Sequence, residues 1–292
     1  MDSAAEFGHL EVVQWLHENR KEGCTTDAMD MAASNGHSQV VQWLQTNRKE
    51  GCTSNAMDFA AQHGHLKVVQ WLHFNRKEGA THYAIDNAAS YGHLEVIQWL
   101  HANRHEGCSQ SAHCSVDAMD LAAANGHLEM VQWLAEHRSE GCTTDAMDLA
   151  TAHGFLAVVK WLHCYREEGC TLAAMDAAAA NGHLDVVKWL HSHRDEGCTK
   201  NALVDACLAG HCSVAKWLMQ FRSEGSDTAA INAATQGGHD ELVQWLVDHA
   251  FLRDCYSYPP HWKSVSMYYE LESEGSDGES GGEVEEYPVF FA

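Results

Sequence analysis

Apolar residues recur along the chain in a pattern that predicts pairs of helices. Val40, Trp43 and Leu44 are spaced i, i+3, i+4, which places them on one face of a helix. The stretch just before them is rich in alanine and methionine, which favour helix, and it ends at a glycine suited to a left-handed helix end. We therefore predict a short helix over 27–36, a turn, and a longer helix over 38–51.

The start of the short helix carries acidic residues. Asp27 is a favourable N-cap, and Asp30 follows three residues later, as in a capping box. The same arrangement recurs at Asn55/Asp58, Asp117/Asp120 and Asp145/Asp148. We predict that these pairs begin the short helices.

Tryptophan gives the period of the helix pairs. It recurs every 28 residues, with one step of 34, at Trp15, Trp43, Trp71, Trp99, Trp133, Trp161, Trp189, Trp217 and Trp245. A period of this size is the mark of a solenoid, in which each unit buries its apolar face against its neighbours. We expect nine units over 1–253, followed by a separate acidic and largely disordered tail over 254–292.

Two stretches resemble the ankyrin repeat. Residues 27–37, Asp-Ala-Met-Asp-Met-Ala-Ala-Ser-Asn-Gly-His, are similar to its first half, and residues 8–16, Gly-His-Leu-Glu-Val-Val-Gln-Trp-Leu, to its second. The resemblance implies an all-α, ankyrin-type solenoid of nine helix-turn-helix repeats. The unit is shorter than the family's, which has about 33 residues. We therefore expect the β-hairpin fingers of the family to be short or absent.

The resemblance also implies a binding surface. In ankyrin repeats the two residues before the turn glycine line the concave face. The predicted protein-binding residues, named here the recognition row, are Asn35, Gln62, His63, Ser90, Tyr91, Asn125, His153 and Asn181. Imidazole, phenol and amide groups suit protein recognition, whereas the alternative is that the row is solvent-exposed filler.

We expect a protein–protein interaction scaffold or adaptor, or alternatively a structural solenoid segment of a longer multidomain chain. The net charge of −23 repels phosphate backbones and anionic lipid, so we expect neither nucleic acid nor membrane as a partner. The eleven cysteines occur without an export signal, which favours a reduced protein in the cytoplasm or nucleus. We expect a monomer.

Most candidate chemical groups recur once in each unit, which favours structural roles. The histidine after the turn glycine, as at His37, predicts a turn hydrogen bond. The cysteine of the link, as at Cys52, predicts a small buried free thiol. The arginine and glutamate of the link, as at Arg48 and Glu50, predict an exposed charge ladder between units. Repeated histidines about 10 Å apart cannot share one metal ion, so we expect no metal and no cofactor.

One insertion breaks the period, at about 109–114. Together with His105 and Cys108 it contains His113 and Cys114, which could be read as a zinc site, as a projecting contact loop or as a plain surface loop. The zinc reading is the least favoured. The chain has no Gly-x-Ser-x-Gly motif, dinucleotide fingerprint or phosphate loop, so we expect no enzyme.

Overall fold

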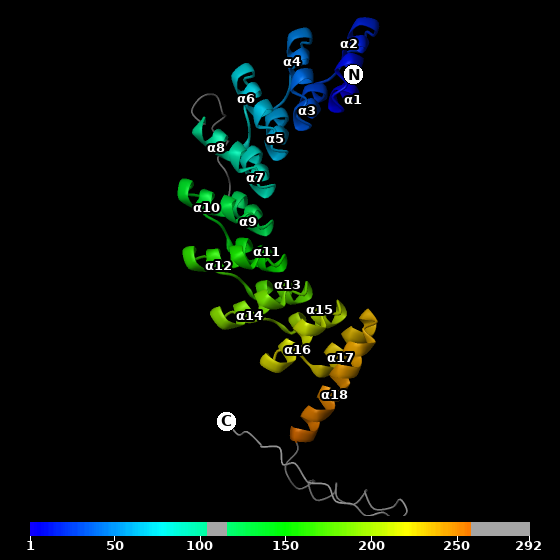
Figure 1. Cartoon of the computed structure of the whole chain (residues 1–292), viewed down its shortest axis with the longest axis vertical. Helices are drawn as coiled ribbons and strands as arrows, with labels where there is room; N and C mark the ends of the chain where they lie inside the picture. The colour runs from blue at the N-terminus through cyan, green and yellow to red at the C-terminus, as the bar shows by residue number, and fades with distance from the viewer. Residues whose placement is uncertain (104–115, 258–292) are drawn as a thin grey trace, which may run out of the picture. The chain divides into compact units, whose positions relative to one another are not determined.

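The computed structural model describes residues 1–103 and 116–257, with side chains to residue 249. These residues form eighteen helices and no strand, which confirms the predicted all-α solenoid (Figure 1). The short first helix of each unit is α1 (Asp2–Glu6), α3 (Asp27–Ser34), α5 (Asn55–Gln62), α7 (His82–Ser90), α9 (Asp117–Ala124), α11 (Thr144–Ala152), α13 (Leu172–Ala180), α15 (Lys200–Leu208) and α17 (Asp227–Gly237). The second helix is α2 (Leu10–Asn19), α4 (Ser38–Asn47), α6 (Leu66–Asn75), α8 (Leu94–Ala102), α10 (Leu128–His137), α12 (Leu156–Tyr165), α14 (Leu184–His193), α16 (Cys212–Phe221) and α18 (Asp240–Ser257).

The chain divides into two compact parts, Met1–Val247 and Asp248–Ala292. The first holds the helix pairs up to the first eight residues of α18, and of the second only the remaining ten residues of α18, to Ser257, are described. The predicted division at 253/254 stays a prediction. Residues 258–292 of the predicted disordered tail (254–292) and the insertion with its candidate zinc ligands lie outside the described residues.

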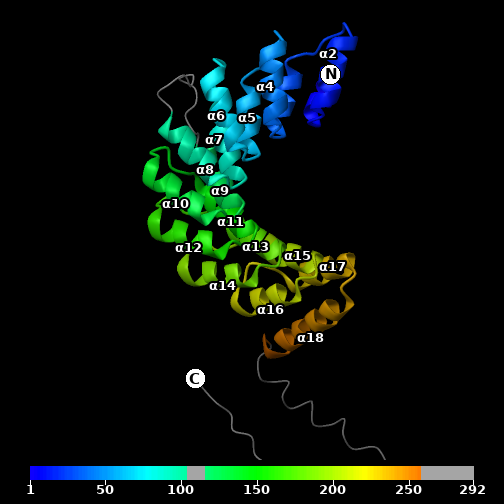
Figure 2. The same ribbon diagram turned by 45° about the horizontal axis from the view of Figure 1, so that its top comes forward.

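Within the first part, the helices form two layers. Each odd-numbered helix packs against the next odd-numbered helix, and each even-numbered helix from α2 to α16 packs against the short helix of its own unit (Figures 1 and 2). We call these the odd-helix layer and the even-helix layer. A unit therefore contacts its sequence neighbours almost exclusively, as in other solenoids.

The core repeats with the units. In the second unit, Ala28, Ala32 and Ala33 are fully buried between odd-numbered helices, where a small side chain allows close approach. Val41 and Leu44 of α4 are buried against them. Burial of a leucine of this kind stabilises the fold by about 2 kcal/mol. The apolar stripe that the sequence predicted is thus the contact between the two layers.

The predicted N-cap residues of the short helices are wrong by one or two positions. Helix α3 begins at Asp27 with Thr26 as its N-cap residue, and the hydroxyl of Thr25 accepts a hydrogen bond of 3.2 Å from the Asp27 amide. In α7 the N-cap is Thr81, whose hydroxyl accepts from the Tyr83 amide at 3.2 Å. The N-caps predicted at Asn55, Asp117 and Asp145 are corrected in the same way, because each N-cap lies one or two residues earlier. The aspartates three residues further on have another role, described below.

The second helix of each unit is shorter than predicted. Helix α4 ends at Asn47, and Arg48 is extended, with φ −126° and ψ 160°. The Asn47 amide nitrogen donates to the Trp43 carbonyl at 2.8 Å, which satisfies one of the carbonyls left open at the helix end. Residues 48–54 are therefore an extended link without a strand, and the expected absence of β-hairpin fingers is confirmed for the described residues.

Four link cysteines, Cys52, Cys142, Cys170 and Cys198, are buried free thiols, as expected, whereas Cys24 is only partly buried. Cys52, Cys142 and Cys170 are each 8% exposed. Burial raises the pKa of each of these thiols to about 11. They are therefore neutral packing groups with little thiolate at neutral pH.

Thiol alkylation should separate the cysteines by exposure. Cys164 is exposed, whereas Cys207 is fully buried and burial raises its pKa to about 12. Because the thiolate is the reacting species, we expect iodoacetamide to label Cys164 at least about a hundredfold faster than Cys207. Peptide mapping by mass spectrometry measures both rates, and the same reaction in urea is the control, where the rates should converge. Equal rates in the folded protein would contradict the buried position of Cys207.

Candidate protein-binding surface

The odd-helix layer is held together by an aspartate–threonine pair at successive joints. The Asp58 carboxylate, 3% exposed, accepts from the Thr81 amide at 2.8 Å and from the Thr81 hydroxyl at 2.7 Å. The pairs with both hydrogen bonds are Asp2–Thr25, Asp30–Thr53, Asp58–Thr81, Asp120–Thr143, Asp148–Thr171 and Asp176–Thr199. These aspartates join units, which is why they do not form the predicted capping boxes.

Burial acts on these carboxyls. It raises the pKa of Asp30, Asp58 and Asp120, and the hydrogen bonds from threonine oppose it only in part. A carboxylate in this position is held in place by two donors of the next unit. The joint therefore fixes the distance between neighbouring short helices, on which the recognition row lies.

A second contact crosses each joint at the turn. Gly64 has φ +75°, and a Cβ there would lie 2.5 Å from Nδ1 of His93 in the next unit. The histidine ring thus packs directly on the glycine backbone of the preceding turn. At His127 the Nε2 group donates to the Ser90 carbonyl at 3.0 Å, so the predicted turn hydrogen bond is present, with its acceptor in the preceding unit. Burial lowers the pKa of His93, as expected for a ring packed in this way.

The arginine and glutamate columns do not form the predicted exposed ladder between units. Arg48 pairs with Glu50 of its own link, and the two side chains are 20% and 28% exposed. The other side of the guanidinium reaches the preceding unit, with Nη1 3.3 Å from Nδ1 of His17. The arginine is partly buried because it fills the space between two links, and the ion pair holds it there.

The recognition row lies where the short helices end. Three of its asparagines bridge units: the side-chain amide of Asn35 donates to the Glu6 carbonyl at 2.9 Å, that of Asn125 to the Ser90 hydroxyl at 3.2 Å, and that of Asn181 to the Ala152 carbonyl at 2.9 Å. Their amide groups are therefore partly engaged in the joints. Their side-chain oxygens have no partner among the residues that the structure describes.

The histidines and the glutamine of the row are also anchored. His63 Nδ1 lies 3.0 Å from the Phe59 carbonyl, and His153 Nδ1 donates to the Leu149 carbonyl at 2.9 Å. The Gln62 oxygen accepts from Asn87 at 3.1 Å. With Nδ1 bonded to the helix, the Nε2 edge of His153 faces outward as an acceptor.

Tyr91 is the large aromatic side chain of the row, and it is 57% exposed. Its ring centre lies 6.4 Å from that of His63 and 6.5 Å from that of His93, on which it stacks. Members of the row in adjacent units are thus brought together, as His63 with Tyr91 and Ser90 with Asn125. Members separated by several units are not, because the row runs along the stack.

Sequence reasoning missed one residue of this surface. Phe7 precedes the first turn glycine, as Tyr91 precedes the fourth, and it is 65% exposed. The signal was present, because Gly8-His9 matches Gly92-His93. It was missed because the first unit has a short first helix of only five residues.

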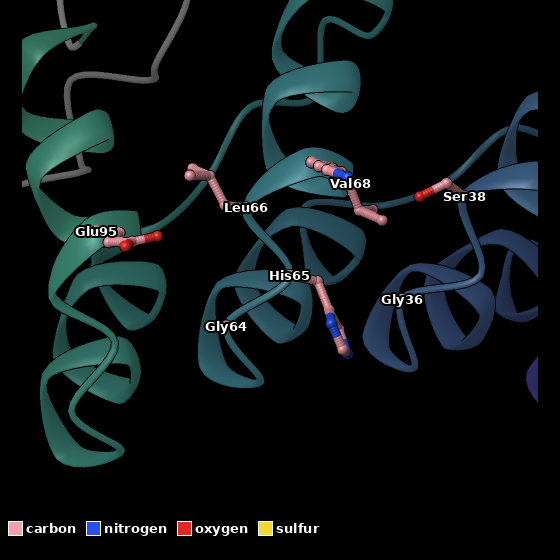
Figure 3. A pocket seen from close by; sticks show the side chains of 8 residues that line it. Gly36, Ser38, Gly64, His65, Leu66, Val68 and Glu95 are labelled. Carbon is pink, nitrogen blue, oxygen red and sulfur yellow. The ribbon is translucent and has the colours of Figure 1, made fainter.

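A shallow hollow of about 380 Å³ lies at the turns, beside the row. It is lined by Gly36, Ser38, Gly64, His65, Leu66, Lys67, Val68 and Glu95. Figure 3 shows His65 between the turns that carry Gly36 and Gly64. A similar hollow of about 400 Å³ lies one unit further on, around His93 and Glu129. Because the hollow recurs with the repeat and its lining side chains are not arranged for catalysis, we attribute the hollow to the stacking of units.

The described residues contain no group of three or more histidine, cysteine or acidic side chains placed to hold a metal ion. Among the same residues, none of the helices combines the length and the apolar character that crossing a membrane would require.

Comparison with known families agrees with this architecture. The model for ankyrin repeats in many copies matches residues 1–45, 85–135 and 119–163, and the model for ankyrin repeats in three copies matches residues 147–227 and 174–255. The chain belongs to the ankyrin-repeat family. Ankyrin repeats are in general protein–protein interaction modules. A search of curated proteins gave no match.

Proposed function

We propose that this protein is a non-enzymatic scaffold or adaptor that binds a protein partner through the recognition row. The observation that carries the proposal is Tyr91, whose ring is 57% exposed and flanked by those of His63 and His93. A large aromatic side chain that is half exposed and held by its neighbours loses little freedom on binding. Tyrosines in such positions often supply much of the binding energy at interfaces.

Further apolar groups extend this surface. Phe7 and Leu208, which lie beside their turn glycines, are 65% and 41% exposed. The asparagines between them present carbonyl oxygens at the level of the same turns. Apolar anchors separated by polar groups suit a protein surface better than a small molecule.

The net charge of −23 favours a protein partner over nucleic acid or anionic membrane. The free thiols among the described cysteines support a location in the cytoplasm or nucleus. We propose that the chain acts as a monomer, since each unit already buries its apolar faces against its neighbours.

Affinity capture from cell extract tests the row. We expect His63→Asn combined with Tyr91→Asn to reduce capture of a partner at least about tenfold, since both are replaced by the residue found in the row at Asn35. Quantitative mass spectrometry of the captured proteins measures the change.

The matched control removes an exposed aromatic from the even-helix layer. Phe74, 70% exposed on α6, is replaced by threonine, the residue at the equivalent position Thr46. We expect this variant to capture the partner as the wild type does. A partner retained equally by the row variant would rule out the recognition row as its site.

A further inference from the structure

The position just before the tryptophan divides the even-helix layer. It is glutamine in six units, at Gln14, Gln42, Gln70, Gln98, Gln132 and Gln244. In the three units between Gln132 and Gln244 it is lysine, at Lys160, Lys188 and Lys216. All three lysines are exposed and lie on α12, α14 and α16.

The position four residues after the tryptophan changes in the same region. It is asparagine in the first four units, where the side chain bonds the tryptophan carbonyl, as in Asn47. In the next four units it is aromatic, at His137, Tyr165, His193 and Phe221. Each of these rings stacks on the tryptophan of its own helix, with centroid distances of 4.5, 5.1, 4.5 and 5.0 Å. Tyr165 is 70% exposed and Phe221 is 50% exposed.

Ring contacts join these helices into one surface. His163 of α12 meets Trp189 of α14 edge-on at 5.1 Å, and His191 of α14 meets Trp217 of α16 at 5.1 Å. The Lys216 ammonium lies 5.1 Å from the ring centre of Trp245. Exposed lysines and aromatic rings are therefore both present on each of α12, α14 and α16, which follow one another in Figure 2. We call this the lysine–aromatic strip, made of Lys160, Tyr165, Lys188, His193, Lys216 and Phe221.

The charge of the strip differs from that of the rest of the chain. Helices α12, α14 and α16 hold three lysines and one acidic residue, Asp185, whereas α2, α8 and α10 hold glutamates and no lysine. The ion pairs found among the described residues all join arginine to glutamate, and none involves a strip lysine. In a chain of net charge −23, α12, α14 and α16 thus present three exposed lysines in successive units with a single acidic residue among them.

We propose that the lysine–aromatic strip binds an extended acidic peptide segment of a partner protein. Neighbouring units are about 10 Å apart, and a chain in the polyproline II conformation has three residues per turn and rises about 3.1 Å per residue, so the carboxylates at every third residue share one face and meet successive lysines. Apolar or aromatic residues between the carboxylates pack on Tyr165 and Phe221. Three lysines in a chain of net charge −23 match a short segment with a few carboxylates better than the dense charge of nucleic acid or of an anionic lipid surface. This surface lies on the even-helix layer and is independent of the recognition row.

A synthetic peptide tests the proposal. The probe is a fluorescent peptide of about twelve residues with glutamate at every third position and tyrosine beside each glutamate. The control peptide has glutamine in place of each glutamate. Fluorescence anisotropy with the full chain gives the two dissociation constants at low and at physiological salt. We expect the glutamate peptide to bind at least about tenfold more tightly, with the difference shrinking as salt is added.

Two lysine variants with equal charge change locate the binding. The strip variant carries Lys160→Gln, Lys188→Gln and Lys216→Gln, which places the residue of the other six units at each position. The control variant carries Lys21→Gln, Lys49→Gln and Lys77→Gln, three exposed lysines of the links. Equal helicity and equal urea midpoints establish that all three proteins are folded.

We expect the strip variant to weaken binding of the glutamate peptide about tenfold and the control variant less than about twofold. Equal weakening by both variants would mean that only overall charge matters, and it would overturn the proposal. Equal binding of the two peptides would also overturn it. The proposal would also be overturned if duplex DNA or phosphatidylserine vesicles bound more tightly than the peptide and lost binding in the strip variant. The occupant of the strip would then be a different polyanion.

Discussion

Replacing Asp58 by alanine is expected to lower the free energy of unfolding by about 3 kcal/mol. The buried carboxylate accepts two hydrogen bonds from Thr81, at 2.8 and 2.7 Å. Its removal leaves the Thr81 amide without a partner in a place that water reaches poorly, and loss of a charged hydrogen-bond partner costs about 1.5–3 kcal/mol per bond. Urea denaturation followed by circular dichroism measures the change.

A double-mutant cycle with Thr81→Ala separates the pair from other effects. We expect Thr81→Ala to destabilise the protein as well, since this hydroxyl also accepts from the Tyr83 amide at the start of α7. We expect the double variant to be clearly more stable than the sum of the two single changes predicts. Full additivity would show that Asp58 and Thr81 do not act together.

The effect of Asp58 also depends on pH. Burial raises the pKa of this carboxyl, so the folded state binds its proton more tightly than the unfolded state does. The contribution of this group to stability therefore rises as the pH falls towards the ordinary aspartate pKa of about 3.9. Asp58→Asn removes that titration. We expect the free energy of unfolding of this variant, relative to that of the wild type, to decline between pH 7 and pH 4.5. The glutamates with lowered pKa contribute equally to both proteins, so their effect cancels in the difference.

Replacing Gly64 by alanine is the second change with a large expected effect, also about 3 kcal/mol. Its φ of +75° costs about 1 kcal/mol for a residue with a Cβ, and the added atom would lie 2.5 Å from Nδ1 of His93. The ring must move out of a packed joint, which adds about 2 kcal/mol, as overpacking does in protein cores.

Gly238 supplies the control for this prediction. Its φ is +74°, and a Cβ there would meet no atom within 4 Å. We expect Gly238→Ala to lower the free energy of unfolding by only about 1 kcal/mol, the cost of a positive φ for a residue with a Cβ. Adding His93→Ala to Gly64→Ala should recover part of the loss. If Gly64→Ala and Gly238→Ala have equal urea midpoints, the contact between His93 and the preceding turn contributes nothing.

The helix pairs and their turns could be predicted from sequence because their signals are local. The spacing of Val40, Trp43 and Leu44 defines one helix face, and Gly36 has the positive φ expected at the end of the short helix, +76°. The absence of fingers followed from the length of the link. These features depend on residues close together in the chain.

The joints could not be predicted because their partners are 23 residues apart. Asp58 and Thr81 meet only after two units have stacked, and from sequence alone Asp58 looked like part of a capping box. Aligning the units does show that the aspartate and threonine positions change together, a signal that was overlooked. At the last joint the aspartate position is Val204 and the threonine position is Asp227, so both partners are missing together. Ser226 caps α17 there instead, accepting from the Ala229 amide at 3.1 Å.

The recognition row was predicted by position, and its anchoring was not. The sequence placed Asn35 and Asn181 at the turns, but the donation of their amides to the preceding unit required the stacked geometry. The three strip lysines can be found by aligning the units, whereas the stacking of Tyr165 on Trp161 cannot. The binding role of the row stays a prediction until a partner is captured.

The aspartate–threonine joint has a consequence for the gene. At six joints one unit supplies an aspartate and the next unit supplies a threonine, so the ends of these units are interchangeable with those of their neighbours. Unequal recombination that adds or removes 84 nucleotides, three for each of the 28 residues of a unit, would rebuild the same joint at the crossover. The array can therefore change length in one mutational step. The last junction is an exception, because Val204 and Asp227 replace the aspartate and the threonine there.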